Sequence, residues 1–153
     1  MIYCYVESPL GKILLCSDKK YLTALYLPEH KLYRADYTKT KCELFKQTSQ
    51  QLHEYFAGKR QSFTLDIFLK GTDFQLKVFE ALQTIKYGEV KTYKQLANSI
   101  KNPKAVRAVG LANSKNPVSI IVPCHRVIGS NGKLTGYAGG LKAKQWLINH
   151  EGR

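Results

Sequence analysis

Residues 1–70 combine short runs of strand-forming residues with one longer helical repeat. Residues 2–6, 12–16 and 21–27 are rich in β-branched, aromatic and aliphatic side chains, a composition that predicts three short strands. Between the first two runs, Ser8-Pro9-Leu10-Gly11 supplies the residue types of a tight turn. We therefore expect a small antiparallel sheet.

A helical repeat follows and predicts a helix that covers this sheet. Its inward positions recur at helical spacing until Gly58 stops the pattern. They are Leu44, Phe45, Thr48, Leu52, Tyr55 and Phe56. Residues 63–69 then alternate apolar and mostly polar side chains, which predicts a half-buried strand. We place a domain boundary after it, with an α/β lobe over residues 1–70 and a second lobe over residues 71–153.

Capping sequences predict where the helices of the second lobe begin. Thr72 with Gln75, and Thr92 with Gln95, each place a hydroxyl three residues before an amide side chain. This is the spacing of a capping box, in which each side chain binds the backbone N–H of the other residue. We expect one helix to begin at each box.

The ends of these helices predict a second lobe that is mainly helical. The apolar spacing indicates one helix over residues 72–85 and another over residues 93–100, which ends before Asn102-Pro103. A further helix over residues 104–113 follows almost at once. Two helices joined by so short a turn are typical of a helix-turn-helix, whose second helix approaches DNA. The predicted fold is therefore α+β, with a sheet lobe and a helix-turn-helix or winged-helix lobe.

The second of these two helices carries a strip of small residues. Ala105, Ala108 and Ala112 share one side, and Lys104 and Arg107 lie beside them. Small side chains would let the helix backbone approach a nucleic acid groove closely, although an ordinary helix hairpin has the same pattern. Charge favours the first interpretation, because 24 Lys and Arg against 11 Asp and Glu leave a net charge of +13, as expected for a protein with a polyanionic partner. A charge that only favours solubility is the alternative.

Two absences limit the remaining classes of protein. Residues 1–27 contain no long apolar stretch, so we expect no membrane partner and a cytoplasmic, nucleoid-associated location, or a nuclear one in a eukaryote. The four cysteines form no CxxC pair, which predicts neither a zinc module nor a disulfide framework. A disulfide between Cys4 and Cys16 is geometrically possible if the turn sets them opposite each other, but a reducing cytosol disfavours it.

The candidate chemistry lies where an apolar run meets a cysteine. Ile120-Ile121-Val122 predicts a buried strand that delivers Cys124 to its end, and His125 and Arg126 follow directly. The reactive form of cysteine is the thiolate, which a histidine base or a nearby positive charge favours. A buried, inert cysteine is the alternative.

Several motifs of the second half together resemble the O6-alkylguanine-DNA alkyltransferase family. They are Tyr87-Gly88-Glu89-Val90, Thr92-Tyr93, Ala105-Val106-Arg107-Ala108-Val109-Gly110, Asn116-Pro117, Ile121-Val122-Pro123-Cys124-His125-Arg126-Val127-Ile128-Gly129 and Gly136-Tyr137-Ala138-Gly139-Gly140-Leu141. The first half matches weakly, chiefly through Ser8-Pro9-Leu10-Gly11-Lys12. The resemblance implies a ribonuclease-H-like first lobe and single-turnover DNA repair, in which an alkyl group moves from O6 of guanine to the protein itself.

The resemblance also implies roles for the residues near the cysteine. Cys124 would accept the alkyl group, and His125 would take the thiol proton through a water molecule. Glu151 would stabilise the imidazolium, and Asn116 would brace this relay. Tyr93 would donate a hydrogen bond to the guanine ring and crowd the target phosphate. Otherwise, Glu151 belongs to a fraying tail and Tyr93 is an aromatic residue at a helix cap.

Further residues are implied on the DNA side. Arg107 would fill the gap that the flipped nucleotide leaves in the base stack, with a simple phosphate contact as the alternative. The other residues expected at DNA are Lys104, Ala105, Ala108, Tyr93 and Arg126, and those expected to wall the substrate pocket are Tyr137, Ala138, Gly139 and Val127. The expected partner is double-stranded DNA that carries O6-alkylguanine. Some members of the family bind a structural zinc in the first lobe, but Cys4, Cys16 and His30 do not indicate its ligands here. We expect no metal, no other cofactor and a monomer.

Three competing interpretations remain. A damage-sensing relative would bind alkylated guanine without repairing it, but such proteins lack the acceptor cysteine. A winged-helix regulator would leave His125, Tyr137 and Glu151 unexplained. A cysteine hydrolase would need an oxyanion loop and repeated turnover.

Overall fold

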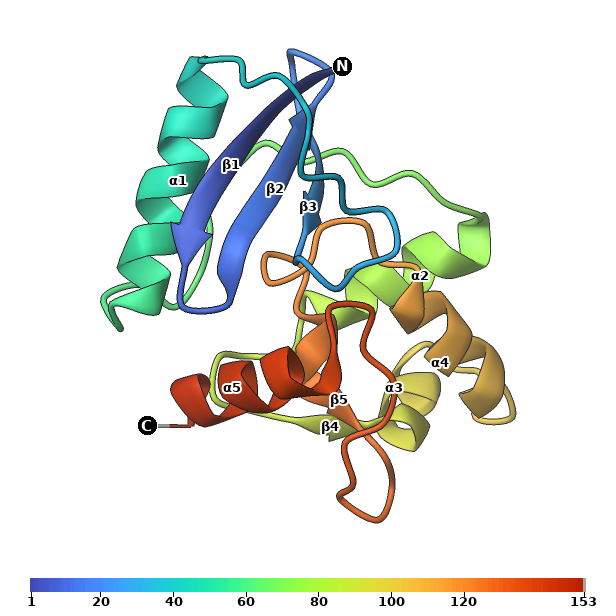
Figure 1. The fold of residues 1–153 in the computed structure, drawn as a ribbon. Coiled ribbons are helices and arrows are strands. Elements are labelled where there is room, and N and C mark those ends of the chain that lie inside the picture. The colour runs from blue at the N-terminus through green and yellow to red at the C-terminus, as the bar shows by residue number, and fades with distance from the viewer. Residues whose placement is uncertain (153) are drawn as a thin grey trace.

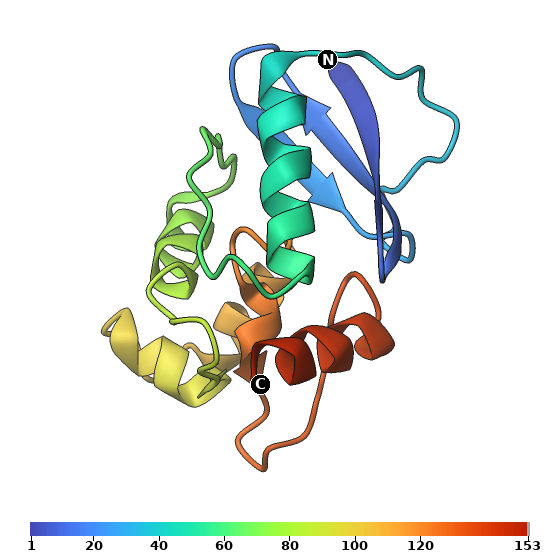
Figure 2. The same ribbon diagram turned by 90° about the vertical axis from the view of Figure 1, so that its left-hand side faces the viewer.

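The computed structural model describes residues 1–152, and its chain begins with a three-stranded antiparallel sheet. β1 (Ile2–Ser8), β2 (Gly11–Ser17) and β3 (Leu22–Tyr26) lie in the order β1-β2-β3. α1 (Glu43–Phe56) packs across one face of the sheet, as Figures 1 and 2 show. Gly11 adopts a φ of 98°, a conformation that favours glycine, at the end of the β1–β2 turn. The predicted sheet and its covering helix are confirmed.

The register of β1 and β2 separates the two cysteines of the sheet. Cys4 lies opposite Leu15, and Cys16 lies opposite Tyr3. Because successive side chains of a strand point to opposite faces, Cys4 and Cys16 point to different sides of the sheet. All four cysteines are free. The disulfide that the sequence left open is therefore not formed.

The alternating segment before the second lobe is extended but is not a strand. Its alternate positions 63, 65, 67 and 69 are half-buried, and the positions between them, including Phe68, are exposed. It pairs with β3 through one parallel bridge between Leu22 and Ile67, with hydrogen bonds from the Leu22 N–H to Asp66 O (2.9 Å) and from the Phe68 N–H to Leu22 O (3.0 Å). The prediction of a strand over residues 63–69 is wrong, because the segment meets the sheet edge only briefly.

The second half is mainly helical, as predicted. Its helices are α2 (Asp73–Leu82), α3 (Tyr93–Ser99), α4 (Val106–Ser114) and α5 (Leu141–Glu151). Both capping boxes are formed, at the first residues of α2 and α3. The short strands β4 (Lys91–Thr92) and β5 (Val127–Ile128) pair in parallel between α5 and α3 (Figure 1). No element was predicted over residues 141–151, so α5 is an addition to the prediction.

The larger of two hydrophobic clusters joins the two halves of the described chain. It includes Leu25 of β3, Tyr55 of α1, Ile85 after α2 and Val118 before the cysteine. The Leu25 N–H donates to Pro117 O at 2.9 Å, which ties β3 to the second half. The domain boundary at residue 70 stays a prediction. No helix within residues 1–152 is long and apolar enough to span a bilayer.

Candidate active site

Cys124 follows a tight buried turn rather than a strand. Ile120 has a φ of 73°, in the left-handed region, and the Val122 N–H donates to Val118 O at 3.0 Å across the turn. The prediction of a strand over residues 120–122 is therefore wrong. The run is apolar because the turn lies in the core, where Ile120 and Val122 are fully buried.

The side chain of Asn116 holds this turn together. Its Oδ1 accepts from the Val118 N–H at 3.0 Å, and its Nδ2 donates to Val122 O at 2.8 Å. Asn116 is itself buried, so these bonds are shielded from water. The structure thus brings Asn116 to the turn that positions Cys124, and its part in a proton relay stays a prediction.

The residues after the turn form a short 3-10 helix, η1 (Cys124–Arg126), which meets the end of α5. His125 is fully buried, and its Nε2 lies 2.8 Å from Glu151 Oε2. Arg126 donates to the same carboxylate from Nε to Oε1 (2.7 Å) and from Nη2 to Oε2 (3.0 Å). Glu151 is not a fraying tail, because it is buried in the last turn of α5.

Arg126 is buried, which contradicts its predicted contact with DNA. It is 7% exposed, and its remaining guanidinium nitrogen, Nη1, donates to Ile85 O at 2.7 Å. All of its nitrogens therefore have partners inside the protein. The prediction that Arg126 contacts DNA is wrong, because its charge faces Glu151.

Tyr55 also belongs to this network, although it was not predicted as a site residue. Tyr55 lies on α1, and its fully buried hydroxyl group donates to Glu151 Oε2 at 2.6 Å. The helix of the first lobe thus contacts the carboxylate of the second. One signal was available, since a tyrosine on the buried face of a helix needs a partner for its hydroxyl.

Hydrogen bonds give this network its charge state. Burial alone would raise the pKa of Glu151, but hydrogen bonds from His125 and Arg126 lower that pKa to about 2. Burial lowers the pKa of His125 even though Glu151 opposes the shift. His125 is therefore neutral at pH 7 and carries its proton on Nε2, toward the carboxylate. Its Nδ1 has no hydrogen-bond partner among residues 1–152, which leaves the basic nitrogen available.

The thiol of Cys124 needs such a base. Burial raises its pKa above the ordinary value, while a hydrogen bond from Asn116 and the charge of Lys144 act in the opposite direction. Cys124 is thus protonated in the resting protein at neutral pH, and its thiolate forms when a base removes the proton.

Lys144 is a second residue that the sequence analysis missed. It is a fully buried residue of α5, and its Nζ donates to the carbonyl oxygens of Thr135 (2.9 Å) and Gly136 (3.4 Å). Burial lowers its pKa to about 8, so it is largely cationic at pH 7. The signal was its spacing, because Lys144, Leu147 and Glu151 share one helix face.

The loop before α5 brings the expected pocket residues near the cysteine. The hydroxyl group of Tyr93 donates to Thr135 O at 3.1 Å. This bond tethers the middle of the loop between β5 and α5. The hydroxyl of Tyr137 is buried, and both burial and Cys124 raise the pKa of Tyr137 well above 10. A Cβ at Gly139 would lie 2.6 Å from a Leu27 methyl carbon, so no side chain fits there.

The other two expected pocket residues differ in exposure. Ala138 is half-buried, whereas Val127 is fully buried in β5. The roles of all four residues as pocket walls stay predictions.

The expected DNA-contacting residues of α4 lie on an accessible surface. Lys104, Arg107 and Ala108 are exposed, and Ala105 is half-buried at the N-cap of α4. Gly110 of α4 faces the ring of Tyr93, because a Cβ there would lie 3.7 Å from the ring. The helix-turn-helix therefore sets the exposed basic start of α4 near Tyr93, the tyrosine that bonds to the loop before α5.

We expect acid stability to depend on Tyr55. Because the pKa of Glu151 is lowered in the folded state, its contribution to stability is fully present above the unfolded pKa and is lost as pH falls toward about 2. Tyr55→Phe removes one donor and should move this loss to higher pH. Denaturant unfolding between neutral pH and pH 2 measures the effect, and Tyr21→Phe, directly before β3, is the matched control. Equal pH profiles for both variants would contradict the assignment.

The fold and the site together define a class of protein. A helix-turn-helix lies beside a buried cysteine whose neighbours are a neutral histidine, a buried carboxylate and a buried lysine. The chain belongs to the 6-O-methylguanine DNA methyltransferase family. The ribonuclease-like domain of this family matches residues 1–69, and its DNA-binding domain matches residues 73–153.

Individual relatives match over almost their whole length. A methylated-DNA–protein-cysteine methyltransferase of Methanosarcina acetivorans is 49% identical, over 99% of both chains. The constitutive enzyme of that name from Bacillus subtilis is 44% identical, over 97% of this chain and 94% of its own. The crystal structure of Mycobacterium tuberculosis OGT in complex with DNA superposes with a TM-score of 0.91 at 45% identity, covering 99% of this chain and 93% of that one.

Proposed function

We propose that the protein repairs DNA by transferring an alkyl group from O6 of a damaged guanine to Sγ of its own Cys124. The observation that carries the proposal is the 2.8 Å contact between Glu151 and His125, the residue that directly follows Cys124. The chain belongs to a family of DNA methyltransferases, in which a cysteine activated in this way can accept an alkyl group. A damage sensor needs no acceptor cysteine, and a regulator without chemistry needs neither this relay nor the buried lysine.

The chemistry is a single displacement. His125 Nδ1 takes the thiol proton through a water molecule, and Glu151 holds the resulting imidazolium. The thiolate attacks the alkyl carbon, so that one C–S bond forms as the C–O bond to guanine breaks. Guanine leaves with the electron pair of that bond and takes up one proton, which balances the proton lost by the thiol. The thioether has no good leaving group, so each molecule reacts once.

The buried cation favours the charged states along this path. Lys144 lowers the pKa of Cys124, because a positive charge nearby favours the thiolate. We assign Tyr93 to the guanine ring and to crowding of the target phosphate, as its position between Gly110 and the loop before α5 supports. Tyr137, Ala138, Gly139 and Val127 are assigned to the wall of the guanine pocket.

DNA is the macromolecular partner. The family's DNA-binding domain matches residues 73–153, a relative of the same fold is bound to DNA, and the chain has a net charge of +13. We assign Lys104, Ala105, Ala108 and Arg107 to the duplex, with Arg107 in the gap left by the flipped nucleotide. The substrate is a duplex with O6-alkylguanine, and the protein acts on it as a monomer.

We expect DNA affinity to fall steeply with salt and to depend little on sequence. Lys94, Lys101, Lys104, Arg107 and Lys115 lie on or near the helix-turn-helix, and phosphate contacts from such residues release counterions. Titration of labelled duplexes at several ionic strengths gives the slope. Lys104→Ala should reduce this slope by about one, whereas Lys46→Ala, on the outer surface of α1, should not change it. Affinity that ignores salt would contradict the placement of the basic surface.

Arg107→Ala should separate DNA handling from alkyl transfer. Free O6-benzylguanine needs no flipping, so this variant should accept its benzyl group at nearly the parental rate. Alkylated duplex should react roughly tenfold more slowly, because about 1–2 kcal/mol of compensation for the extruded base is lost. Rates of benzyl transfer and of duplex repair, measured side by side, test this. Equal slowing of both substrates would assign Arg107 to the pocket instead.

A further inference from the structure

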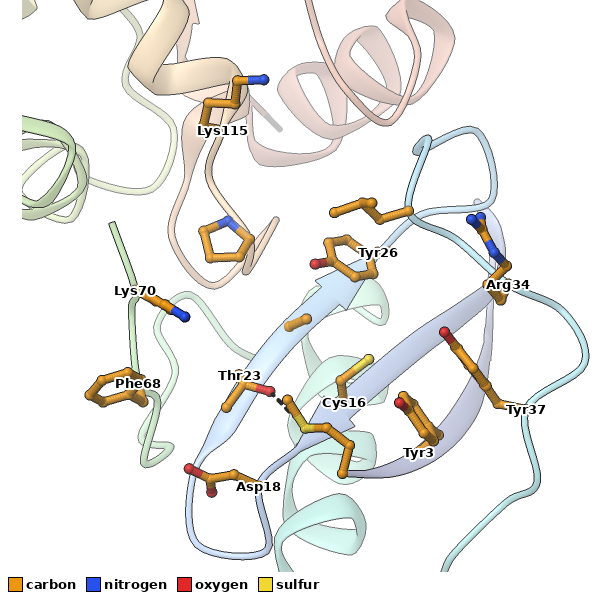
Figure 3. A pocket seen from close by; sticks show the side chains of 14 residues that line it. Tyr3, Cys16, Asp18, Thr23, Tyr26, Arg34, Tyr37, Phe68, Lys70 and Lys115 are labelled. Atoms are coloured by element: carbon orange, nitrogen blue, oxygen red, sulfur yellow. Dashed lines mark hydrogen bonds between the residues drawn. The ribbon is translucent and has the colours of Figure 1, made fainter. Parts of the chain in front are cut away.

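A second hollow lies on the sheet face that α1 leaves uncovered. It has a volume of about 600 Å³, and Figure 3 shows Cys16 and Thr23 on its floor, on β2 and β3. The loop after β3 forms one wall and the segment before α2 another. Neither Cys124 nor Tyr137 lines it, so it is distinct from the site proposed for alkyl transfer.

Aromatic side chains line much of this hollow. Tyr3 and Tyr37 stack with ring centroids 3.9 Å apart and planes 10° apart. Tyr26 contributes its ring from β3, and Phe68 faces the hollow from the segment before α2 while remaining 51% exposed. Nucleobases stack on such surfaces whatever their sequence, because every base has a π-face.

Positive charge surrounds the aromatic surface. Arg34, Lys70 and Lys115 line the hollow, and none of them forms an ion pair with a carboxylate within residues 1–152. Asp18 is the single acidic residue of the lining, and its carboxylate already accepts N–H groups of the neighbouring turn. The Arg34 guanidinium donates to the backbone carbonyl oxygens of Lys31 (3.2 Å) and Tyr33 (2.9 Å). The hollow therefore has positive charge on its rim that no carboxylate of the described residues neutralises, and it is suited to an anion.

The polar groups on the floor and wall indicate binding rather than chemistry. Burial raises the pKa of Cys16 to about 11, so its thiol stays protonated and unreactive at neutral pH. Burial also raises the pKa of Tyr26, which keeps its hydroxyl neutral and able to donate a hydrogen bond.

We propose that this hollow binds a nucleotide. The base stacks on the tyrosine surface, and the phosphate lies among Arg34, Lys70 and Lys115. The volume is suitable, since small-molecule sites of about 300–1,000 Å³ are usual. A free nucleotide and an unpaired nucleotide of a single strand share this chemistry. A neighbouring hollow shares Tyr26 and Lys115 and extends to Ala138, so the occupant would lie next to the loop assigned to the guanine pocket.

Calorimetry with the full chain tests the proposal and separates the two sources. The probes are dGMP, deoxyguanosine and a short oligothymidylate. We expect saturable binding of dGMP and a roughly tenfold loss without the phosphate. Binding of dGMP identifies the free nucleotide as sufficient, whereas binding of the oligonucleotide alone assigns the site to a single strand.

Variants locate the binding. Tyr37→Ala and Lys70→Ala should each weaken dGMP binding by about five- to tenfold, and Lys77→Ala, which removes an exposed charge on α2, should leave it unchanged. Lys70 is exposed, so its replacement tests the site even if Tyr37→Ala destabilises the loop. NMR of the tyrosine rings should report changes at Tyr3, Tyr26 and Tyr37.

Three results would overturn the proposal. They are the absence of saturable binding of both dGMP and the oligonucleotide at millimolar concentration, undiminished binding by Lys70→Ala, and ring changes confined to Tyr93 and Tyr137.

Discussion

We expect the Cys124→Ala protein to bind alkylated duplex DNA but never to gain mass from it. The parental protein should gain the mass of one alkyl group per molecule, on the peptide that contains Cys124. The reason is that the bond to carbon forms at Sγ, and an alanine has no atom that replaces it. Intact-mass spectrometry after incubation with excess substrate, followed by peptide mapping, measures both quantities.

The control for this experiment is another buried cysteine. Cys16 lies on the far side of the sheet from α1, and burial raises its pKa to about 11, so Cys16→Ala should still accept one alkyl group. Repeated turnover without any change in protein mass would eliminate a single-use acceptor. An alkyl group found on Cys4, Cys16 or Cys42 would show that Cys124 is not the acceptor.

Glu151→Gln should damage both stability and alkyl transfer. The neutral amide leaves the charge of Arg126 buried without its partner, and loss of one member of a buried ion pair commonly costs about 3–5 kcal/mol. The same change removes the charge that stabilises a protonated His125. General-base assistance contributes about 100-fold or more to rates, so we expect a loss of that order in benzyl transfer. Denaturant unfolding and single-turnover rates at low temperature measure the two effects.

A second glutamate offers a matched control. Glu54 on α1 binds Arg60 at 2.9 Å, but its side chain is 36% exposed, against 2% for Glu151. Exposed ion pairs contribute about 0–1 kcal/mol, so Glu54→Gln should change stability little and leave alkyl transfer intact. If the two variants lost similar stability, burial would not be what makes the Glu151 network strong.

Local sequence predicted the elements whose causes are local. The capping boxes at Thr72 and Thr92 were read correctly because each bond joins residues three apart. The three strands of the sheet followed from the composition of short runs, and α1 followed from its helical periodicity. The family resemblance, spread over many motifs, pointed to Cys124, His125 and Glu151, and the family itself is confirmed.

The tertiary structure decided what depends on distant contacts. An apolar run is equally compatible with a buried strand and a buried turn, and the side chain of Asn116 selects the turn before Cys124. Arg126 was predicted to contact DNA. Its guanidinium instead binds Glu151, which is 25 residues away in the chain and lies inside the protein.

Dependence on distant contacts also explains why Tyr55 and Lys144 were not predicted as part of the site. Tyr55 joins the site through a hydrogen bond across 96 residues, and the fold buries the charge of Lys144 near Cys124. Sequence by itself determined the three-stranded sheet, α1, the helix starts at the two capping boxes and the family, because each of these follows from residues that are close together in the chain. Only the packed chain decided which charges face one another, because burial and pairing are properties of positions in space.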